Sequence, residues 1–202
     1  MTNPPTQASL ILLVDDDTLI LGLLSRALEA AGFRAIAANS GAEALALLED
    51  GAIQPQLAVL DITMPGMSGL ELAGHMGGIP YMFLSANDEE GVAERAAEAG
   101  AVGFLLKPID PNQLLPAVRA ALARGAEIQG LRAEEQRLGQ ALREGRETGM
   151  AVGLLMERYR LDRHAALRLL RTQARSTQRK LNDVAAEVLD AVEKLNTFNP
   201  AG

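Results

Sequence analysis

The chain lacks cysteine, an excess of cations and any long apolar run. The absence of Cys from its 202 residues excludes disulfides, thiolate catalysis and cysteine-ligated zinc. No apolar stretch approaches the roughly 20 residues of a membrane span. The polar segment from Met1 to Ser9 has no cationic start before an apolar core, unlike a secretory signal. We therefore expect a cytoplasmic protein with no membrane partner.

Charge is distributed unevenly along the chain. The net charge of −7 argues against a protein that coats nucleic acid along its whole surface. Up to Arg124, six cations face fifteen acids, a net charge of −9, whereas the rest has thirteen cations and eleven acids, a net charge of +2. This asymmetry indicates two regions with different partners.

Between residues 9 and 124, short apolar runs alternate with segments of helical periodicity. Strands are expected near 10–14, 33–38, 57–61, 80–84 and 102–106, and helices near 19–28, 40–48, 68–76, 88–99 and from Pro111 onward. Asn87 or Asp88 is expected to cap the fourth helix. The alternation predicts an α/β fold with a five-stranded, doubly wound parallel sheet of the flavodoxin type.

Polar side chains stand where four of these strands end. Asp15 and Asp16 follow the first strand, Asp61 ends the third, and Ser85 and Lys107 end the fourth and fifth. The carboxyl ends of parallel strands meet at one edge of a sheet, so these groups should converge. Close carboxylates need a cation between them, and oxygen donors favour Mg²⁺ or Mn²⁺. A carboxylate beside such an ion and an ammonium is suited to attack phosphorus and form an aspartyl-phosphate.

Four motifs at these positions resemble the receiver domain of two-component response regulators. They are Val14-Asp15-Asp16-Asp17, Leu60-Asp61-x-x-Met64-Pro65-Gly66-Met67-x-Gly69-Leu70, Leu84-Ser85-Ala86 and Phe104-Leu105-Leu106-Lys107-Pro108. The resemblance covers residues 9–124. It implies a non-enzymatic switch, apart from the domain's own Mg²⁺-dependent phosphorylation and dephosphorylation, with a sensor histidine kinase as partner.

The resemblance also assigns a role to each residue. It implies that Asp61 is the phosphoacceptor. The implied metal ligands are Asp15, Asp16, Asp61 and the backbone carbonyl of Thr63. The implied phosphate-binding and switch residues are Ser85, Phe104 and Lys107.

The segment between Asp61 and Ser85 departs from the usual pattern of the family, and one residue in it argues against a rival class. The segment is shorter than is usual in the family and rich in glycine at its end, which predicts a truncated third helix. Phosphatases of the dehalogenase type also use an Asp nucleophile on a strand, but they need a second Asp two residues later. Thr63 occupies that position here, which argues against this class.

Residues 125–147 are expected to form a helical linker. A partial heptad favours a two-stranded coiled coil, and hence a homodimer; its members are Ile128, Leu131, Leu138 and Leu142. Several glycines and Glu135, which falls on the same seam, oppose a continuous coil.

Residues 148–195 are expected to form a small all-α domain of three helices. The first continues the linker to about Tyr159, Asp162 caps the second, and Ser176 or Thr177 caps the third. Between Arg158 and Lys180 there are eight Lys and Arg, of which seven are Arg, against one acid, Asp162. A charge run is usually a solvated face, but arginine favours phosphate contacts and stacking on bases.

This region resembles the ANTAR domain of transcription antitermination regulators. The residues that carry the resemblance are Ala151-x-Gly153-Leu154-Leu155-Met156-x-Arg158, Ala165-x-x-x-Leu169-Leu170-Arg171-x-x-Ala174 and Arg179-Lys180-Leu181-x-Asp183-Val184-Ala185. It implies a dimer that binds RNA hairpin loops and prevents transcription termination. The expected RNA-binding residues are Arg158, Arg163, His164, Arg168, Arg171, Arg175, Arg179 and Lys180. Two alternatives remain open at this point, a DNA target and a protein-interaction adaptor that binds no nucleic acid.

Overall fold

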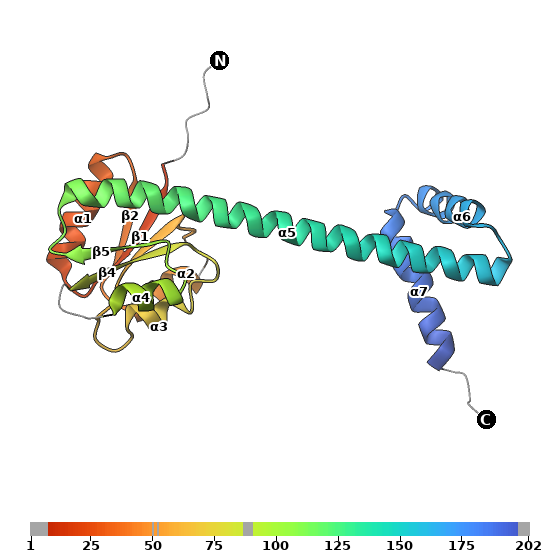
Figure 1. The fold of residues 1–202 in the computed structure, drawn as a ribbon, viewed down its shortest axis with the longest axis horizontal. Coiled ribbons are helices and arrows are strands. Elements are labelled where there is room, and N and C mark those ends of the chain that lie inside the picture. Colours follow the sequence, from red (N-terminus) through yellow and green to blue (C-terminus); the bar gives the residue numbers. More distant parts are fainter. Residues whose placement is uncertain (1–7, 50, 52, 87–90, 198–202) are drawn as a thin grey trace, which may run out of the picture. The chain divides into compact units, whose positions relative to one another are not determined.

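The computed structural model describes residues 8–49, 51, 53–86 and 91–197. The chain separates into two compact units, one ending at Leu131 and the other beginning at Arg132. The helix α5 runs through both (Figure 1). Among the described residues, no helix combines the length and the apolar character needed to cross a membrane.

The first unit contains a five-stranded sheet in which every strand pair is parallel, in the order β2-β1-β3-β4-β5. The strands are β1 (Leu10–Val14), β2 (Arg34–Ala38), β3 (Leu57–Asp61), β4 (Tyr81–Ala86) and β5 (Gly103–Lys107). Every residue of β1 and β3 is buried, as continuous apolar runs predict for central strands covered on both faces. This arrangement confirms the predicted fold class.

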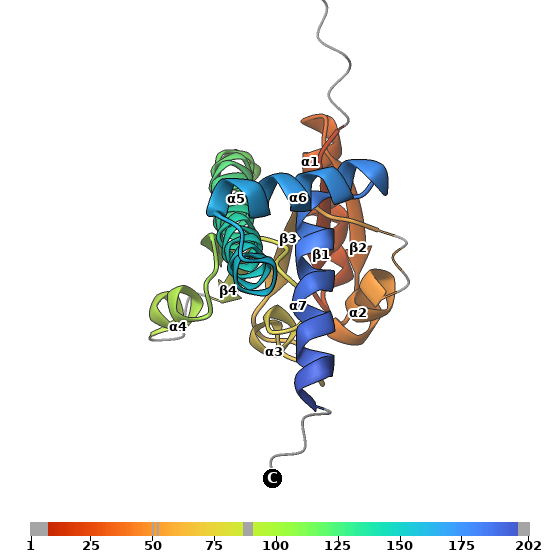
Figure 2. The same cartoon turned by 90° about the vertical axis from the view of Figure 1, so that its right-hand side faces the viewer.

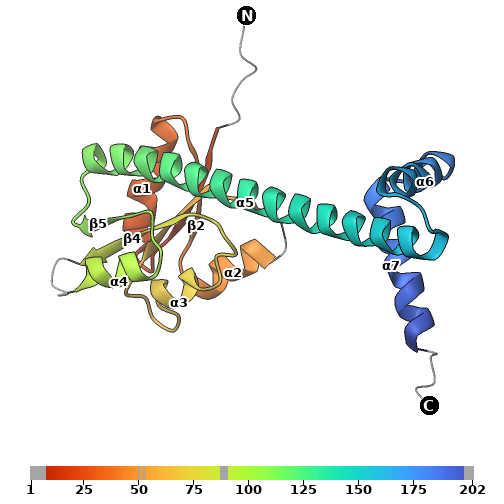
Figure 3. The ribbon, with the colours of Figure 1, turned by 45° about the vertical axis from the view of Figure 1, so that its right-hand side comes forward.

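Helices cover both faces of this sheet and enclose two apolar cores (Figure 3). They are α1 (Thr18–Ala30), α2 (Gly41–Glu49), α3 (Gly69–Ala73), α4 (Val92–Glu98) and the first part of α5 (Pro111–Tyr159). Side chains alternate between faces along a strand. Leu12 therefore packs in the core with α2, α3 and α4, whereas Leu13 packs with α1 and α5. The layers leave the carboxyl ends of the strands open for a site.

Helix α3 is truncated as predicted, since only Gly69–Ala73 is helical, and it ends before the expected Met76. Its start is fixed by a capping box in which Ser68 and Glu71 each accept from the other's backbone N–H. After Ala73 the backbone N–H groups of residues 74–76 each bond three residues back, and Gly77 and Gly78 then take positive φ values of 58° and 94°, so the chain does not return to the helix. Helix α4 begins at Val92, and the predicted caps Asn87 and Asp88 lie outside the described residues.

The beginning of α5 is packed tightly against the first unit. A Cβ atom at Gly125 would lie 2.5 Å from Cγ of Pro80, so only glycine fits at this contact. Ile128 joins the core beneath α1 and α5, and Gln129 donates a hydrogen bond of 3.4 Å to the carbonyl of Gly78. Further along, the heptad leucines are exposed, and Leu142 is 75 % accessible.

The second unit consists of the end of α5 with α6 (Arg163–Ser176) and α7 (Leu181–Thr197), three helices as predicted (Figure 2). Small side chains such as Ala151, Ala166 and Ala185 are fully buried where the helices meet. Asp162 caps α6 by accepting from the Ala165 N–H at 2.7 Å, as predicted. The predicted cap at Ser176 or Thr177 is wrong.

The reason for that error is that Thr177 ends one helix instead of starting another. Its hydroxyl donates at 2.8 Å to the carbonyl of Gln173, one turn back in α6. Gln178 then adopts a left-handed φ of 54°, and the Arg179 N–H reaches back to the Ala174 carbonyl at 3.0 Å. This helix-terminating turn delays the start of α7 to Leu181.

Candidate functional site

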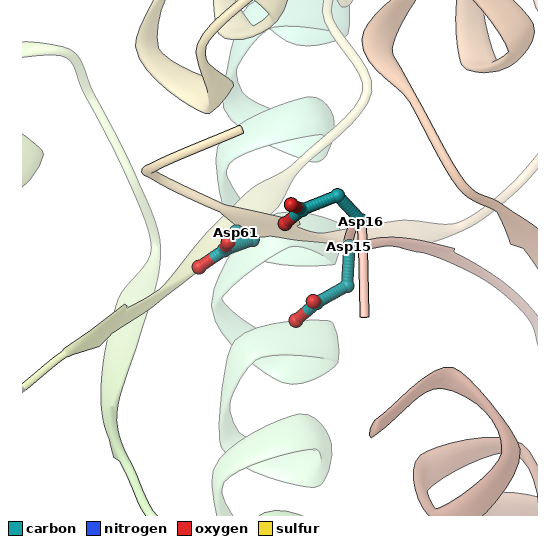
Figure 4. A group of neighbouring side chains, drawn as sticks. All are labelled: Asp15, Asp16 and Asp61. Atoms are coloured by element: carbon teal, nitrogen blue, oxygen red, sulfur yellow. The ribbon is translucent and has the colours of Figure 1, made fainter. Parts of the chain in front are cut away.

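Three carboxylates converge at the carboxyl ends of β1 and β3. Asp15 and Asp16 directly follow β1, and Asp61 is the last residue of β3 (Figure 4). One oxygen from each can be chosen so that all lie within 4.8 Å of one another. Asp15 and Asp61 are buried, with 0 % and 4 % exposure, whereas Asp16 is exposed. The predicted acidic cluster is therefore present and opens to solvent on one side.

Lys107, at the end of β5, places its ammonium between the two buried carboxylates. Its Nζ lies 2.8 Å from Oδ2 of Asp15 and 3.0 Å from Oδ1 of Asp61. The other oxygen of Asp15 accepts from the Asp17 N–H at 2.9 Å, and Asp17 in turn caps α1. Residues at the ends of β1, β3 and β5 thus hold both carboxylates in place without a bound ligand.

Burial and charge set the protonation of this group. Burial raises the pKa of Asp61; the bond to Lys107 opposes the rise, and repulsion from Asp15 and Asp16 adds to it. Burial pulls the pKa of Lys107 down, but its bonds to Asp15 and Asp61 outweigh this and leave the pKa above its ordinary value. The ammonium is therefore charged at neutral pH, and the carboxyl groups outnumber it by three to one.

This excess fits a divalent cation with oxygen ligands. Three carboxyl groups share a single ammonium in this largely buried pocket. Carboxylates are the donors that Mg²⁺ prefers, and Mg²⁺ keeps water or phosphate oxygens in its remaining positions. The open side at Asp16 gives such ligands a way in. The residues present therefore suit a magnesium site.

The loop after Asp61 depends on a glycine whose role the sequence did not reveal. A Cβ atom at Gly69 would lie 2.0 Å from the backbone oxygen of Asp61. The Gly69 N–H instead donates at 3.0 Å to the carbonyl of Ile62, which closes the loop that contains Thr63. Gly69 therefore holds in place the segment whose Thr63 carbonyl is the predicted metal ligand.

The two predicted switch residues have different surroundings. Ser85 is buried at 1 % exposure, and its hydroxyl donates at 3.0 Å to the carbonyl of Ala86 and not to Asp61. Phe104 is 40 % exposed on β5, so it is not a core aromatic side chain. In the register of β4 and β5, Ser85 pairs with Leu106. Leu106 is exposed, as Phe104 is.

The predicted RNA-binding cations lie on the surface of the second unit, and all of them are exposed. His164, Arg168, Arg171 and Arg175 recur at helical spacing along α6. Arg179 differs from the others, because it pairs with Glu187 of α7 and donates to the Asp183 carbonyl at 3.4 Å. In the described part of the chain, it is the one member of the predicted set held in an ion pair.

Comparison with known proteins identifies both units. The family model for the response regulator receiver domain matches residues 11–119, which is more than half of the chain. The chain belongs to the response regulator receiver family. The model for the ANTAR domain matches residues 136–189. This response regulator therefore has a receiver domain followed by an ANTAR domain, as the two resemblances implied.

One relative matches nearly the whole chain, and others match part of it. The transcriptional regulatory protein PdtaR of Mycobacterium tuberculosis is 29 % identical over 201 residues, covering 94 % of this chain and 97 % of its own. The DNA-binding response regulator MtrA of the same organism is 31 % identical over 122 residues, covering 59 % of this chain and 53 % of its own.

The structural matches cover the receiver part. A response regulator receiver protein from Burkholderia phymatum is 33 % identical with a TM-score of 0.54, covering 57 % of this response regulator and 95 % of its own chain. The chemotaxis protein CheY4 of Vibrio cholerae is 27 % identical with a TM-score of 0.51, covering 56 % and 98 %.

Proposed function

We propose that this response regulator accepts a phosphoryl group on Asp61 from a sensor histidine kinase and, in response, controls transcription termination by binding RNA hairpins. The observation that carries the receiver half is the ammonium of Lys107 held within 3.0 Å of two buried carboxylates. Under this proposal residues 9–124 receive the phosphoryl group, and residues 148–195 bind RNA in the cytoplasm. Residues 125–147 form the linker that joins these two domains.

The pocket's own residues account for the chemistry. Asp15, Asp16, Asp61 and the Thr63 carbonyl would hold Mg²⁺, which supplies positive charge beside the incoming phosphoryl oxygens. An oxygen of Asp61 attacks phosphorus while the bond from phosphorus to the donor's histidine nitrogen breaks. Lys107 is placed to neutralise the oxygens of the transferred group. Ser85 then turns its hydroxyl from Ala86 toward the phosphoryl oxygens, and Phe104 follows inward from its exposed position.

The ANTAR match and the cations of α6 support the output. Exposed arginines offer bidentate contacts to phosphates, and among the described residues only Arg179 of this set forms an ion pair. MtrA is described as DNA-binding, but its similarity to this chain extends over only 122 residues, 59 % of this chain. A second copy is expected to pair with the first through the exposed leucines of α5 when Asp61 is phosphorylated.

The test of the output compares a hairpin RNA with duplex DNA of the same stem sequence at equal salt. We expect the full-length protein to bind the hairpin and to bind the duplex only at non-specific strength. Equal affinity would favour the DNA alternative, and no binding to either would favour an adaptor.

A further inference from the structure

The last two helices of the second unit carry opposite charge. Helix α6 contains four arginines and no acid, whereas α7 contains four acids and one lysine, so their net charges are +4 and −3. All four arginines and all four acids are exposed. The helices pack together through buried apolar side chains, and among the described residues no arginine of α6 forms an ion pair with an acid of α7. Both sets of charge therefore remain available to a partner.

Helix α7 also has a hollow on its exposed side. It measures about 440 Å³ and is lined by two alanines, three acids and two cations. One of the cations, Arg179, is already paired with Glu187 of the same helix. The carboxylates of Asp183 and Asp190 are in no ion pair among the described residues. The hollow therefore offers apolar surface with negative charge beside it.

Helix α6 has the features that would fill such a hollow. Leu169 is 44 % exposed, although the other leucines of this helix pack in the core of the unit. Arg168 directly precedes it, so this leucine borders the row of arginines on α6. An apolar side chain beside arginines matches alanines beside carboxylates in both polarity and charge.

We propose that α6 of one copy packs on α7 of a second copy, with Leu169 in the alanine-lined hollow and the adjoining arginines against Asp183 and Asp190. The two helices run in different directions within the unit (Figure 2). A twofold axis between these directions exchanges them, so that α6 lies on α7 of the partner twice and both contacts form at once. Packing α6 on α6 instead would set arginines against arginines.

This contact differs from the pairing through the leucines of α5. It is held largely by exposed charge, so salt should weaken it, whereas an apolar seam is insensitive to salt. It also covers the cations of α6. A second copy and RNA therefore compete for one surface, a consequence that rests on the RNA-binding function proposed above, whereas the contact itself does not.

Two charge-reversal variants test the contact by mixing. The first is Arg168→Glu with Arg171→Glu, and the second is Asp183→Lys with Asp190→Lys. Each alone sets like charges together at both contacts, so its dimer dissociation constant should be about tenfold or more above that of wild type. In an equimolar mixture one contact is native and the other has both charges reversed, so dimers should return. Sedimentation of the full-length, unphosphorylated proteins at low salt measures this.

Two control variants separate this contact from other causes of association. Arg26→Glu with Arg34→Glu changes the net charge as the first variant does, but at exposed positions of the receiver, and should dimerise like wild type. Leu142→Gln, which alters the exposed leucines of α5, should also dimerise like wild type. Loss of the dimer in Leu142→Gln, with no loss in the charge-reversal variants, would place the interface on α5 and overturn the proposal.

The mixing result decides the remaining cases. Wild type that is monomeric at low salt up to its highest soluble concentration contradicts the proposal. So does a mixture that stays monomeric although circular dichroism shows both variants folded, because the reversed charges then do not meet between copies. A dimer that returns on mixing supports it, and also shows that neither variant had lost its fold.

The competition with RNA is tested on the second variant, which keeps the arginines of α6. Its affinity for a hairpin RNA should fall by about tenfold when the first variant is added at about ten times the dissociation constant of the mixed dimer. The first variant is titrated alone to correct for its own RNA binding. Unchanged affinity while the mixed dimer forms would refute the competition. If the second variant and wild type both bind no RNA, the proposed function fails, and sedimentation still decides the contact.

Discussion

The acidic pocket of the receiver and the cationic surface of the ANTAR unit use charge in opposite ways. The pocket buries two carboxylates and pairs both with Lys107. The cations predicted to bind RNA lie in solvent, and apart from Arg179 they have no ion pair among the described residues. Buried charge is costly unless it is paired, whereas exposed charge is screened and contributes little to folding. The pocket should therefore govern stability and chemistry, and the surface should govern affinity.

The largest expected difference comes from removing one cation in each region. Lys107→Ala leaves two buried carboxylates unpaired and should lower the free energy of unfolding by about 3 kcal/mol. Arg168→Ala, on the exposed face of α6, should change it by less than about 0.5 kcal/mol. Urea denaturation of both variants measures this. Similar losses in the two would break the contrast, and saturating Mg²⁺ should recover part of the loss in Lys107→Ala.

A second prediction concerns the backbone beneath Asp61. Gly69→Ala forces a methyl group against the Asp61 carbonyl oxygen, which lies 2.0 Å from the required position. It should lower the free energy of unfolding by about 2–3 kcal/mol and slow phosphorylation. Gly22→Ala is the control, because Gly22 in α1 has no neighbour within 4 Å, and it should stabilise by up to about 1 kcal/mol. Equal effects would show that the loop tolerates the added methyl.

The pH dependence of stability sharpens the comparison further. The folded chain raises the pKa of Asp61, chiefly by burial, so it holds this proton more tightly than the unfolded chain does. The protonated Asp61 therefore contributes to the free energy of unfolding. This contribution is fully present below the ordinary aspartate pKa of about 3.9 and is lost as the pH rises through the raised pKa of Asp61. When Mg²⁺ is removed by a chelator, the free energy of unfolding of Asp61→Asn should therefore increase relative to that of wild type as the pH rises.

Denaturation curves of wild type and Asp61→Asn across this range check the sign. The exposed Glu29→Gln serves as the control for removing one carboxylate from the surface. An advantage of Asp61→Asn that shrinks as pH rises would mean that the ionised carboxylate is favoured by the fold.

The smallest effect separates Arg179 from its neighbours on the surface. Arg168→Ala should weaken RNA binding and reduce the salt slope by roughly 0.7 if one phosphate contact is lost. Arg179→Ala should leave that slope unchanged, because Arg179 is engaged with Glu187 and the Asp183 carbonyl. Affinity measured at several salt concentrations distinguishes the two, and a reduced slope for Arg179→Ala would place it on the RNA after all.

The sequence predicted the residues of the acidic pocket, but not the glycines that allow the surrounding backbone to pack. Asp15, Asp61 and Lys107 each end an apolar run, and parallel strands bring such ends together whatever the loops do. The need for Gly69 arises from a loop folding back on Asp61, and the need for Gly125 from α5 packing on Pro80. Neither contact follows from local spacing, because both join residues that a one-dimensional pattern does not relate.

The second unit shows the same limit. Helix α6 and its cap at Asp162 followed from periodicity, but Thr177 was misplaced because a threonine hydroxyl can start a helix or bond back to end one. The pairing of Arg179 with Glu187, eight residues later, depends on where α7 begins. That start is set by the left-handed residue Gln178, for which glycine, the usual marker, is absent.

The most direct test of the account treats wild type and Asp61→Asn with beryllofluoride and Mg²⁺, a mimic of the phosphoryl group, and measures RNA-hairpin affinity before and after. The account predicts a change in affinity in wild type and none in Asp61→Asn. An unchanged affinity in wild type, with the adduct on Asp61 confirmed by fluorine NMR, would contradict the claim that the pocket controls the cationic surface.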